Sequence, residues 1–257
     1  MPVYLMYHEI ELPGRPMCQS EPGYVRYVVP ESAFRAQLTW LKQNGWQGIS
    51  VGDALRQFNT RDIVITFDDG CETDLITAAP LLSELGFRAT FYITVNFLEK
   101  PGFLSRSQLR QLADQGFEIG CHSMTHSHLD DLDQRQLRCE IADSKTALEQ
   151  VTGLPVEHFS CPGGRWNRKV VEVARAAGYL SMATSRASAN SPNTDLFALG
   201  RVVVMRGTKE AKFHRLCKGQ DLWSMRLQDS SRALAKRFLG NTIYDRLRSG
   251  LLLRRIR

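Results

Sequence analysis

The sequence has no long hydrophobic run. None of its 257 residues belongs to a stretch near the ~20 apolar residues that a bilayer-spanning helix needs. Residues 1–15 also lack the basic region followed by an apolar region that is typical of an export signal. We therefore expect a cytoplasmic protein without a membrane span.

Closely spaced cysteine pairs are absent as well. The sequence contains no C-x-x-C, so neither a zinc knuckle nor a dithiol redox motif is indicated. Without an export signal we expect reduced thiols, and we expect those at 71, 121 and 161 to act as small buried hydrophobic groups. The six cysteines are Cys18, Cys71, Cys121, Cys139, Cys161 and Cys217.

Most of the chain has no excess of either charge. The net charge of +6 equals the excess of nine Lys/Arg over three Asp/Glu in residues 221–257, so the other 24 basic and 24 acidic residues cancel. A neutral body argues against a nucleic-acid-binding protein. The basic tail also contains apolar residues, which predicts an amphipathic helix. That helix could lie on an anionic membrane surface or pack on the body with a solvated basic face.

The composition, 43% apolar and 23% charged, is that of a globular protein and excludes collagen-like, low-complexity and disordered classes. The length fits one or two domains. We expect one domain over residues 1–220, followed by the basic tail over 221–257. Neither this division nor the composition predicts an oligomeric state.

Short β-branched or aromatic runs alternate with helical patterns, which predicts an α/β fold around a mainly parallel sheet. Seven strands with intervening helices favour a distorted, incomplete (β/α) barrel, similar to a TIM barrel, over an open sheet. The predicted strands cover 3–8, 63–69, 88–94, 117–123, 158–162, 180–185 and 198–204, and the predicted helices cover 31–44, 74–85, 106–115, 133–151 and 167–177.

Turn and cap residues mark the ends of these helices. Each predicted helix is followed closely by a glycine, and Ser105 with Gln108 has the spacing of a capping box. The stretch from Leu12 to Pro30 is rich in Pro and Gly and is long enough to be a functional loop.

Two adjacent acidic residues end one of the predicted strands. Asp68 and Asp69 follow the apolar run 63–67, and Gly70 permits an abrupt turn after them. Adjacent carboxylates at a strand end repel each other and are costly to desolvate, so a metal or hydrogen-bond donors must compensate them. This pair therefore indicates a functional site.

Two histidines follow another predicted strand. His122 and His126 are four residues apart, a spacing that can direct both imidazoles to one side, and His128 is also available. With one carboxylate they would form a His₂Asp set. Three protein ligands with a position left for water is the pattern of catalytic rather than structural zinc.

These two motifs resemble those of the polysaccharide deacetylases of carbohydrate esterase family 4, the NodB-homology family. Residues 66–70, TFDDG, are similar to the first family motif, and residues 122–126, HSMTH, to the second. The resemblance covers roughly residues 1–205. It implies that Asp68 is the general base and that Asp69, His122 and His126 bind a divalent metal, for which we expect zinc.

The chain departs from the third family motif, which in many members reads R-x-P-[FY]. Here the matching residues 160–164 read SCPGG, so Gly163 can offer its N–H to the oxyanion, but no arginine is present to pair with the base. Arg165, Arg168 or Arg201 could supply the cation. We favour Arg201 because it begins an apolar strand of the predicted sheet.

The last family motif, a strand near the C-terminus that ends in a catalytic histidine, is missing. His214 lies in a helical pattern, and we expect it to be structural. Residues 4–9, YLMYHE, instead place His8 at the end of the first strand. This arrangement resembles the permuted branch of the family, represented by the poly-N-acetylglucosamine deacetylases, and implies that His8 is the general acid.

The resemblance implies a metal-dependent hydrolase that removes N-acetyl groups from the amino sugars of a polysaccharide or a lipid-linked glycan precursor. One alternative is a related amidase or esterase with a non-sugar substrate. The other is a catalytically silent barrel that binds glycan, which the missing third-motif arginine favours. The intact Asp68-Asp69 and His122/His126 motifs oppose the silent barrel, because a binding protein needs no open metal position.

Overall fold

The computed structural model describes residues 2–223, 225 and 226. Its main sheet is parallel, with the strand order β10-β1-β5-β6-β7-β8-β9, and helices cover the outside. The predicted α/β incomplete barrel is therefore confirmed. The strands are β1 (Tyr4–Tyr7), β5 (Asp62–Asp69), β6 (Thr90–Ile93), β7 (Glu118–Cys121), β8 (His158–Ser160), β9 (Ser181–Ala183) and β10 (Val202–Val203).

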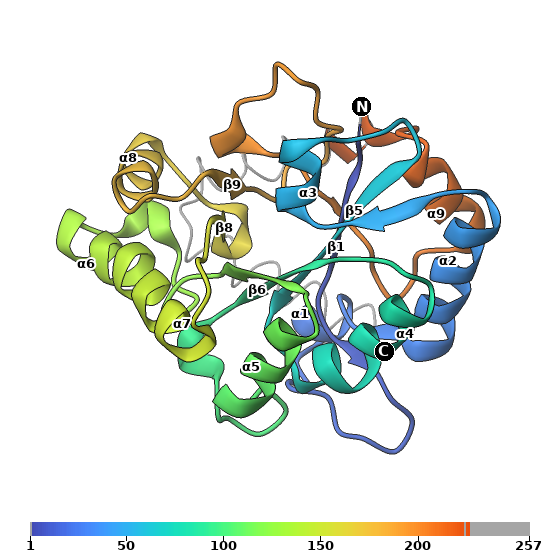
Figure 1. Ribbon diagram of the computed structural model, residues 1–257, viewed down its shortest axis with the longest axis horizontal. Helices are drawn as coiled ribbons and strands as arrows, with labels where there is room; N and C mark the ends of the chain where they lie inside the picture. The colour runs from blue at the N-terminus through green and yellow to red at the C-terminus, as the bar shows by residue number, and fades with distance from the viewer. Residues whose placement is uncertain (1, 224, 227–257) are drawn as a thin grey trace.

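The helices lie on both sides of the central strands in the view of Figure 1, with α2, α4 and α9 on the right and α6, α7 and α8 on the left. Glycines with positive φ follow several of them, including Gly153 after α7. The helices are α1 (Pro22–Val25), α2 (Glu31–Gln43), α3 (Val51–Arg56), α4 (Ala79–Glu84), α5 (Arg106–Asp114), α6 (Gln134–Arg138), α7 (Ser144–Thr152), α8 (Arg168–Ala176) and α9 (Glu210–Cys217).

The sequence pattern predicted most of these elements. The capping box of α5 is present, because the Ser105 hydroxyl accepts from the Gln108 N–H and the Gln108 side chain accepts from the Ser105 N–H. His214 lies in α9 and stacks on Trp40 with 3.8 Å between ring centroids, so its expected helical context is confirmed.

Two predicted helices contain wider π-helical turns. Asp74–Ala78 precedes α4, and Cys139–Asp143 separates α6 from α7. Side-chain periodicity cannot detect one extra residue in a turn, which is why these ranges were predicted as regular helices. Turns of this kind often occur at functional sites.

The sequence pattern missed several short elements. Among them are β2 (Ile10–Glu11), β3 (Val29–Pro30), β4 (Gln47–Ile49), α1 and α3. Strands of two or three residues carry too little alternation to be recognised. β4 pairs with the first half of β5, while β2 and β3 form a separate parallel pair that joins the two ends of the Leu12–Pro30 loop.

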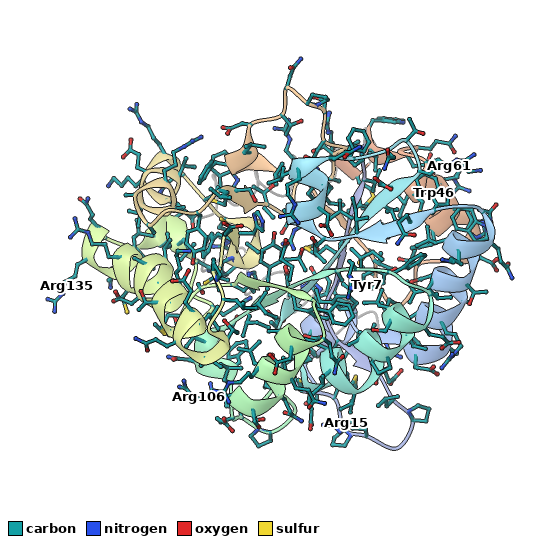
Figure 2. The ribbon with its side chains drawn as sticks, in the orientation of Figure 1. Tyr7, Arg15, Trp46, Arg61, Arg106 and Arg135 are labelled. Atoms are coloured by element: carbon teal, nitrogen blue, oxygen red, sulfur yellow. The ribbon has the colours of Figure 1, made fainter. Side chains whose placement is uncertain are left out.

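The core surrounds β5, in which all eight residues are buried. Figure 2 shows Tyr7 in the middle of the molecule, whereas Arg15, Arg106 and Arg135 extend from its edge. Tyr7 stacks on Phe67 at 5.4 Å, and Phe67 stacks on Phe91 at 4.8 Å, so aromatic contacts join β1, β5 and β6.

Within the described residues, no strand ladder joins β9 to β10, the two ends of the strand order. One parallel bridge, from Ala183 to Leu199, connects β9 to the segment that leads into β10. Arg201 lies in that segment, immediately before β10, and its side chain is buried. The closure of the barrel therefore brings a cation into its interior.

None of the helices in the described part of the chain combines the length and apolar character needed to cross a bilayer. The predicted basic helix of the tail lies almost entirely outside the described residues. Of the range 221–257, only 221–223, 225 and 226 are described.

Candidate active site

The predicted site residues follow the carboxyl ends of neighbouring parallel strands. Asp68 and Asp69 end β5, His122 comes directly after β7, and Ser160 ends β8. Parallel strands bring their carboxyl ends to one face, where sites in this architecture are built. Residues separated by up to 92 positions in the sequence therefore become neighbours.

The structure brings Asp69, His122 and His126 together. The Nε2 atoms of His122 and His126 lie 3.6 and 3.4 Å from Asp69 Oδ1. One donor atom from each side chain lies within 4.8 Å of the others. Asp69 Oδ1 is buried and has no hydrogen-bond partner within the described chain, as expected of an atom that binds a cation.

The ring orientation of His122 also suits metal binding. Its Nδ1 lies 2.9 Å from the carbonyl oxygen of Ser160, which can only accept, so Nδ1 carries the proton and Nε2 keeps its lone pair. Burial lowers the pKa of His122 to about 4, although Asp68 and Asp69 oppose the shift. The imidazole is therefore neutral at pH 7. The residues present fit a divalent metal.

The backbone is strained in the two segments that carry Asp69 and the two histidines. Asp69, Ser123 and His126 have φ values of 84°, 69° and 65°, in the left-handed region that side chains other than glycine disfavour. Such strain persists only where the surrounding structure compensates for it, and it concentrates at functional sites. Both segments that carry the candidate metal ligands, 68–70 and 122–126, contain such residues.

Glu140, in the π-helical segment Cys139–Asp143, holds the loop between the two histidines. Its Oε2 accepts hydrogen bonds from the N–H groups of Met124 (3.0 Å) and Thr125 (2.9 Å). Its Oε1 accepts one from the Thr125 hydroxyl at 2.5 Å. The wider turn thus places a buried carboxylate beneath the loop that carries His126.

Asp68 forms a buried ion pair with Arg201, the arginine that the sequence analysis favoured. Arg201 donates from both terminal nitrogens, to Oδ1 at 2.6 Å and to Oδ2 at 2.8 Å. Burial alone would raise the pKa of Asp68, but the charges of Arg201 and His122 and the hydrogen bonds from Arg201 hold it well below its usual range. The carboxylate is therefore ionised at neutral pH.

The guanidinium of Arg201 is fixed by four further contacts. It donates to Ser160 Oγ at 2.7 Å, to Thr66 Oγ1 at 3.2 Å and to the Thr184 carbonyl oxygen at 3.1 Å. It also lies 5.3 Å from the ring centroid of Tyr92. Ser160, which replaces the family arginine in the sequence, thus supports the arginine that reaches Asp68 from another strand.

The other two candidate arginines are placed elsewhere. Arg168 is on the surface of α8, where it pairs with Glu172 at 2.8 Å, and its side chain is 92% exposed. Arg165 is buried in the segment that leads to α8. Within the described residues, Arg201 and Ser160 donate hydrogen bonds to the Asp68 carboxylate, and His122 Nε2 lies 3.8 Å from its Oδ2.

His8 comes directly after β1, which pairs with β5, as the resemblance to the permuted branch implies. Its ring stacks on Tyr27 with 4.8 Å between centroids, and its Nδ1 is buried without a hydrogen-bond partner in the described chain. Burial lowers the pKa of His8, while the carboxylates of Asp69 and Asp68 act in the opposite direction. The ring therefore lies within electrostatic reach of both carboxylates.

Gly163 occupies the turn Pro162–Gly164 after β8, with φ 59°. A Cβ at this position would lie 3.7 Å from His128 Cδ2, so the glycine is close to the loop that follows the two histidines. Positive φ favours glycine here and leaves the backbone exposed on this side.

The sequence analysis missed Glu140 and the supporting role of Ser160. No local pattern marks either residue, because each acts on a segment 15 to 41 positions away. Glu140 resembles any polar residue of a predicted surface helix. The role of Glu140 can be recognised only in the tertiary structure, where its helix packs against the loop between His122 and His126.

Comparison with known proteins agrees with this geometry. Residues 56–182 match a family model described as polysaccharide deacetylase. The chain belongs to the polysaccharide deacetylase family.

Relatives of this deacetylase cover different shares of its length. YxkH of Bacillus subtilis is 29% identical over 215 residues, 81% of this chain and 73% of that protein. The peptidoglycan-N-acetylglucosamine deacetylase of Bacillus cereus is 32% identical over 122 residues, 47% of this chain and 55% of that enzyme. A crystal structure of a polysaccharide deacetylase from Bacillus cereus superposes with a TM-score of 0.72 and 26% identity, covering 84% of this chain and 68% of that one.

Replacing Glu140 by alanine should weaken metal binding by this deacetylase. The substitution removes three hydrogen bonds that order the His122–His126 loop, and loss of such supporting contacts typically costs about 10- to 100-fold in metal affinity. Competition with a chelator measures the change. Glu84→Ala, on the exposed end of α4, is the matched control. Equal zinc affinity in both variants would contradict the role given to Glu140.

Replacing Arg201 by methionine should destabilise the protein by about 3–5 kcal/mol, because it leaves Asp68 buried without a counter-charge. Adding Asp68→Asn should restore part of that loss, since the double variant has no buried charge to compensate. Urea unfolding of the wild type, both single variants and the double variant measures the coupling. Additive effects of the two substitutions would show that the pair is not energetically linked.

Proposed function

We propose that this polysaccharide deacetylase is a metal-dependent hydrolase that removes N-acetyl groups from amino sugars of a polysaccharide or a lipid-linked glycan precursor. The observation that carries the proposal is the set of converging donor atoms of Asp69, His122 and His126 beside an ionised Asp68 that Arg201 holds in place. A binding protein needs neither feature.

Asp69, His122 and His126 would hold the metal, for which we propose zinc. Two imidazole nitrogens and one carboxylate oxygen form a borderline donor set that suits zinc, and three protein ligands leave a position open. When bound, the ion supplies Lewis acidity, which polarises the acetyl carbonyl and lowers the pKa of water.

Asp68 would act as the general base. Its Oδ2 lies 3.8 Å from His122 Nε2, so the carboxylate borders the metal-ligand set while Arg201 fixes its plane. Arg201 donates one hydrogen bond to each carboxylate oxygen, and the single Ser160 hydroxyl lies 3.5 Å from both, so one of the roughly four lone pairs remains to accept a proton from the attacking water. The lowered pKa of Asp68 makes it a weak base that is ionised at every physiological pH.

His8 and Gly163 would complete the reaction. We assign to His8 the protonation of the leaving amine. Because its pKa is lowered, His8 is neutral at pH 7 and must take up this proton during the reaction. The proton that Asp68 accepts from the attacking water would be passed to His8 and then to the amine, which returns Asp68 to its ionised form. The backbone N–H of Gly163 would donate a hydrogen bond to the oxygen of the acetyl carbonyl as negative charge develops there.

The substrate class rests on family membership and on the relative from Bacillus cereus, whose name states a peptidoglycan N-acetylglucosamine substrate. The sequence argument for a silent glycan-binding barrel was the missing third-motif arginine. Arg201 now pairs with Asp68, so that argument no longer holds.

Metal content and acetate release from N-acetylglucosamine oligomers test the proposal. The wild type should bind metal and release acetate. Asp68→Asn should keep the metal and lose activity by about 10²- to 10⁴-fold, the usual contribution of a general base. His122→Ala should lose the metal together with the activity. Bound metal without acetate from any glycan would favour an amidase or esterase with a non-sugar substrate.

In the same experiment, the His8→Ala variant distinguishes the role of a general acid from that of a metal ligand. It should lower turnover and leave the metal content unchanged, because the metal-ligand set does not include His8. Metal loss equal to that of His122→Ala would contradict the acid assignment.

We also propose that residues 221–257 contact an anionic membrane surface, since they contain nine Lys/Arg and three Asp/Glu together with apolar residues. Deletion of residues 227–257 should abolish sedimentation with vesicles that contain anionic lipid, and added salt should weaken the binding of the full chain. Sedimentation that is unchanged by the deletion would contradict this proposal.

A further inference from the structure

A second cluster of metal-binding side chains lies beside the first one. Glu9, Cys18 and Cys71 each have one donor atom within 4.8 Å of the others. Glu9 follows β1, Cys18 lies in the Leu12–Pro30 loop, and Cys71 comes two residues after Asp69. Glu9 and Cys71 are buried, whereas Cys18 is half-buried.

The donor atoms are held in place by their neighbours. The Cys18 N–H donates to both Glu9 oxygens, at 3.1 and 3.0 Å, and the Tyr24 hydroxyl donates to Glu9 Oε2 at 2.9 Å. The Tyr24 oxygen also lies 3.4 Å from Cys71 Sγ. The Cys18 backbone and the Tyr24 hydroxyl therefore connect both cysteines to the Glu9 carboxylate.

Gly102 allows the backbone to approach the Cys18 side chain closely. Gly102 has φ +87°, and a Cβ on it would lie 3.0 Å from Cys18 Sγ. Its carbonyl oxygen is 2.9 Å from that sulfur. Phe103 forms an antiparallel bridge with Cys71, so the same short segment supports both cysteines.

A buried aspartate beside the cluster, Asp74, has no hydrogen-bond donor to its carboxylate among the described residues. Asp74 is fully buried, and neither of its carboxylate oxygens has a hydrogen-bond partner within the described residues. Burial raises the pKa of Asp74 well above its usual range, and the acidic groups of Cys18, Asp69 and Glu9 raise it further. Acidic groups are concentrated here, and a cation among them would lower their repulsion.

We propose that Glu9, Cys18 and Cys71 form a second metal site, which binds a thiophilic divalent cation such as zinc. Two thiolates and a carboxylate are zinc ligands, and donors around tetrahedral zinc stand roughly 3.5–3.8 Å apart, so the cluster needs to contract by about 1.3 Å at most. The sulfur donors distinguish it from the Asp69, His122 and His126 set, which has only nitrogen and oxygen.

The site would tie three separate segments together. A metal bound by these residues joins the end of β1, the Leu12–Pro30 loop and the turn after β5. Its binding free energy would then stabilise the folded state. His8 is adjacent to Glu9 and Asp69 is close to Cys71 in sequence, so the metal would fix the positions of both neighbours.

Cobalt substitution tests the site without reference to hydrolysis. The full-length reduced protein, loaded with Co²⁺, should bind two equivalents and show thiolate-to-cobalt charge-transfer absorption in the near ultraviolet. Cys18→Ser should bind one equivalent and lose that absorption. His122→Ala should also bind one equivalent but keep it, because its site has no sulfur. Cys139→Ser, at an exposed cysteine, is the matched control and should resemble the wild type.

The wild-type spectrum alone can overturn the proposal, whether or not a variant folds. One equivalent of Co²⁺ without charge-transfer absorption would show that the thiols bind no metal. A disulfide between Cys18 and Cys71, found by peptide mass in protein purified without reductant, together with no second equivalent after reduction, would assign the cysteines to a redox pair instead. Neither result depends on whether glycans are substrates.

Discussion

The buried pair of Asp68 and Arg201 is the interaction on which the site depends. Arg201 lies just before β10, and Asp68 lies near the end of β5, with β1 between these two strands. The pair therefore joins the segment that leads into β10 to the central strand of the sheet. Neither charge is tolerable alone at this depth, because an isolated buried ion costs several kcal/mol. The sheet must close before the carboxylate has its partner.

This pair also separates the roles of two adjacent carboxylates. Asp68 is satisfied by Arg201 and Ser160, whereas Asp69 turns by its positive φ toward His122 and His126 and keeps an unpartnered oxygen. Two identical side chains thus acquire different chemistry from their surroundings. The same turn continues into Cys71, so a second group of donors lies next to the first.

Local signals in the sequence were sufficient for the outline of the fold and for part of the site. Alternating strands and helices predicted the barrel, and the motifs at 68–69 and 122–126 marked residues that the structure brings together. Such signals depend on neighbours within a few positions. The short strand β4 and the π-helical turns escaped detection because their patterns are too brief or too similar to those of regular helices.

The sequence by itself determined the order of strands and helices and marked Asp68, Asp69, His122 and His126 as candidate site residues, because periodicity and motif spacing are properties of the local chain. Only the tertiary structure decided which arginine reaches Asp68, which acid holds the histidine loop and which cysteines meet. Arg201, Glu140 and the Cys18–Cys71 contact each join segments far apart in sequence. Sequence spacing carries no information about such pairs, since their distances are set by how the sheet curls and how the loops cross it.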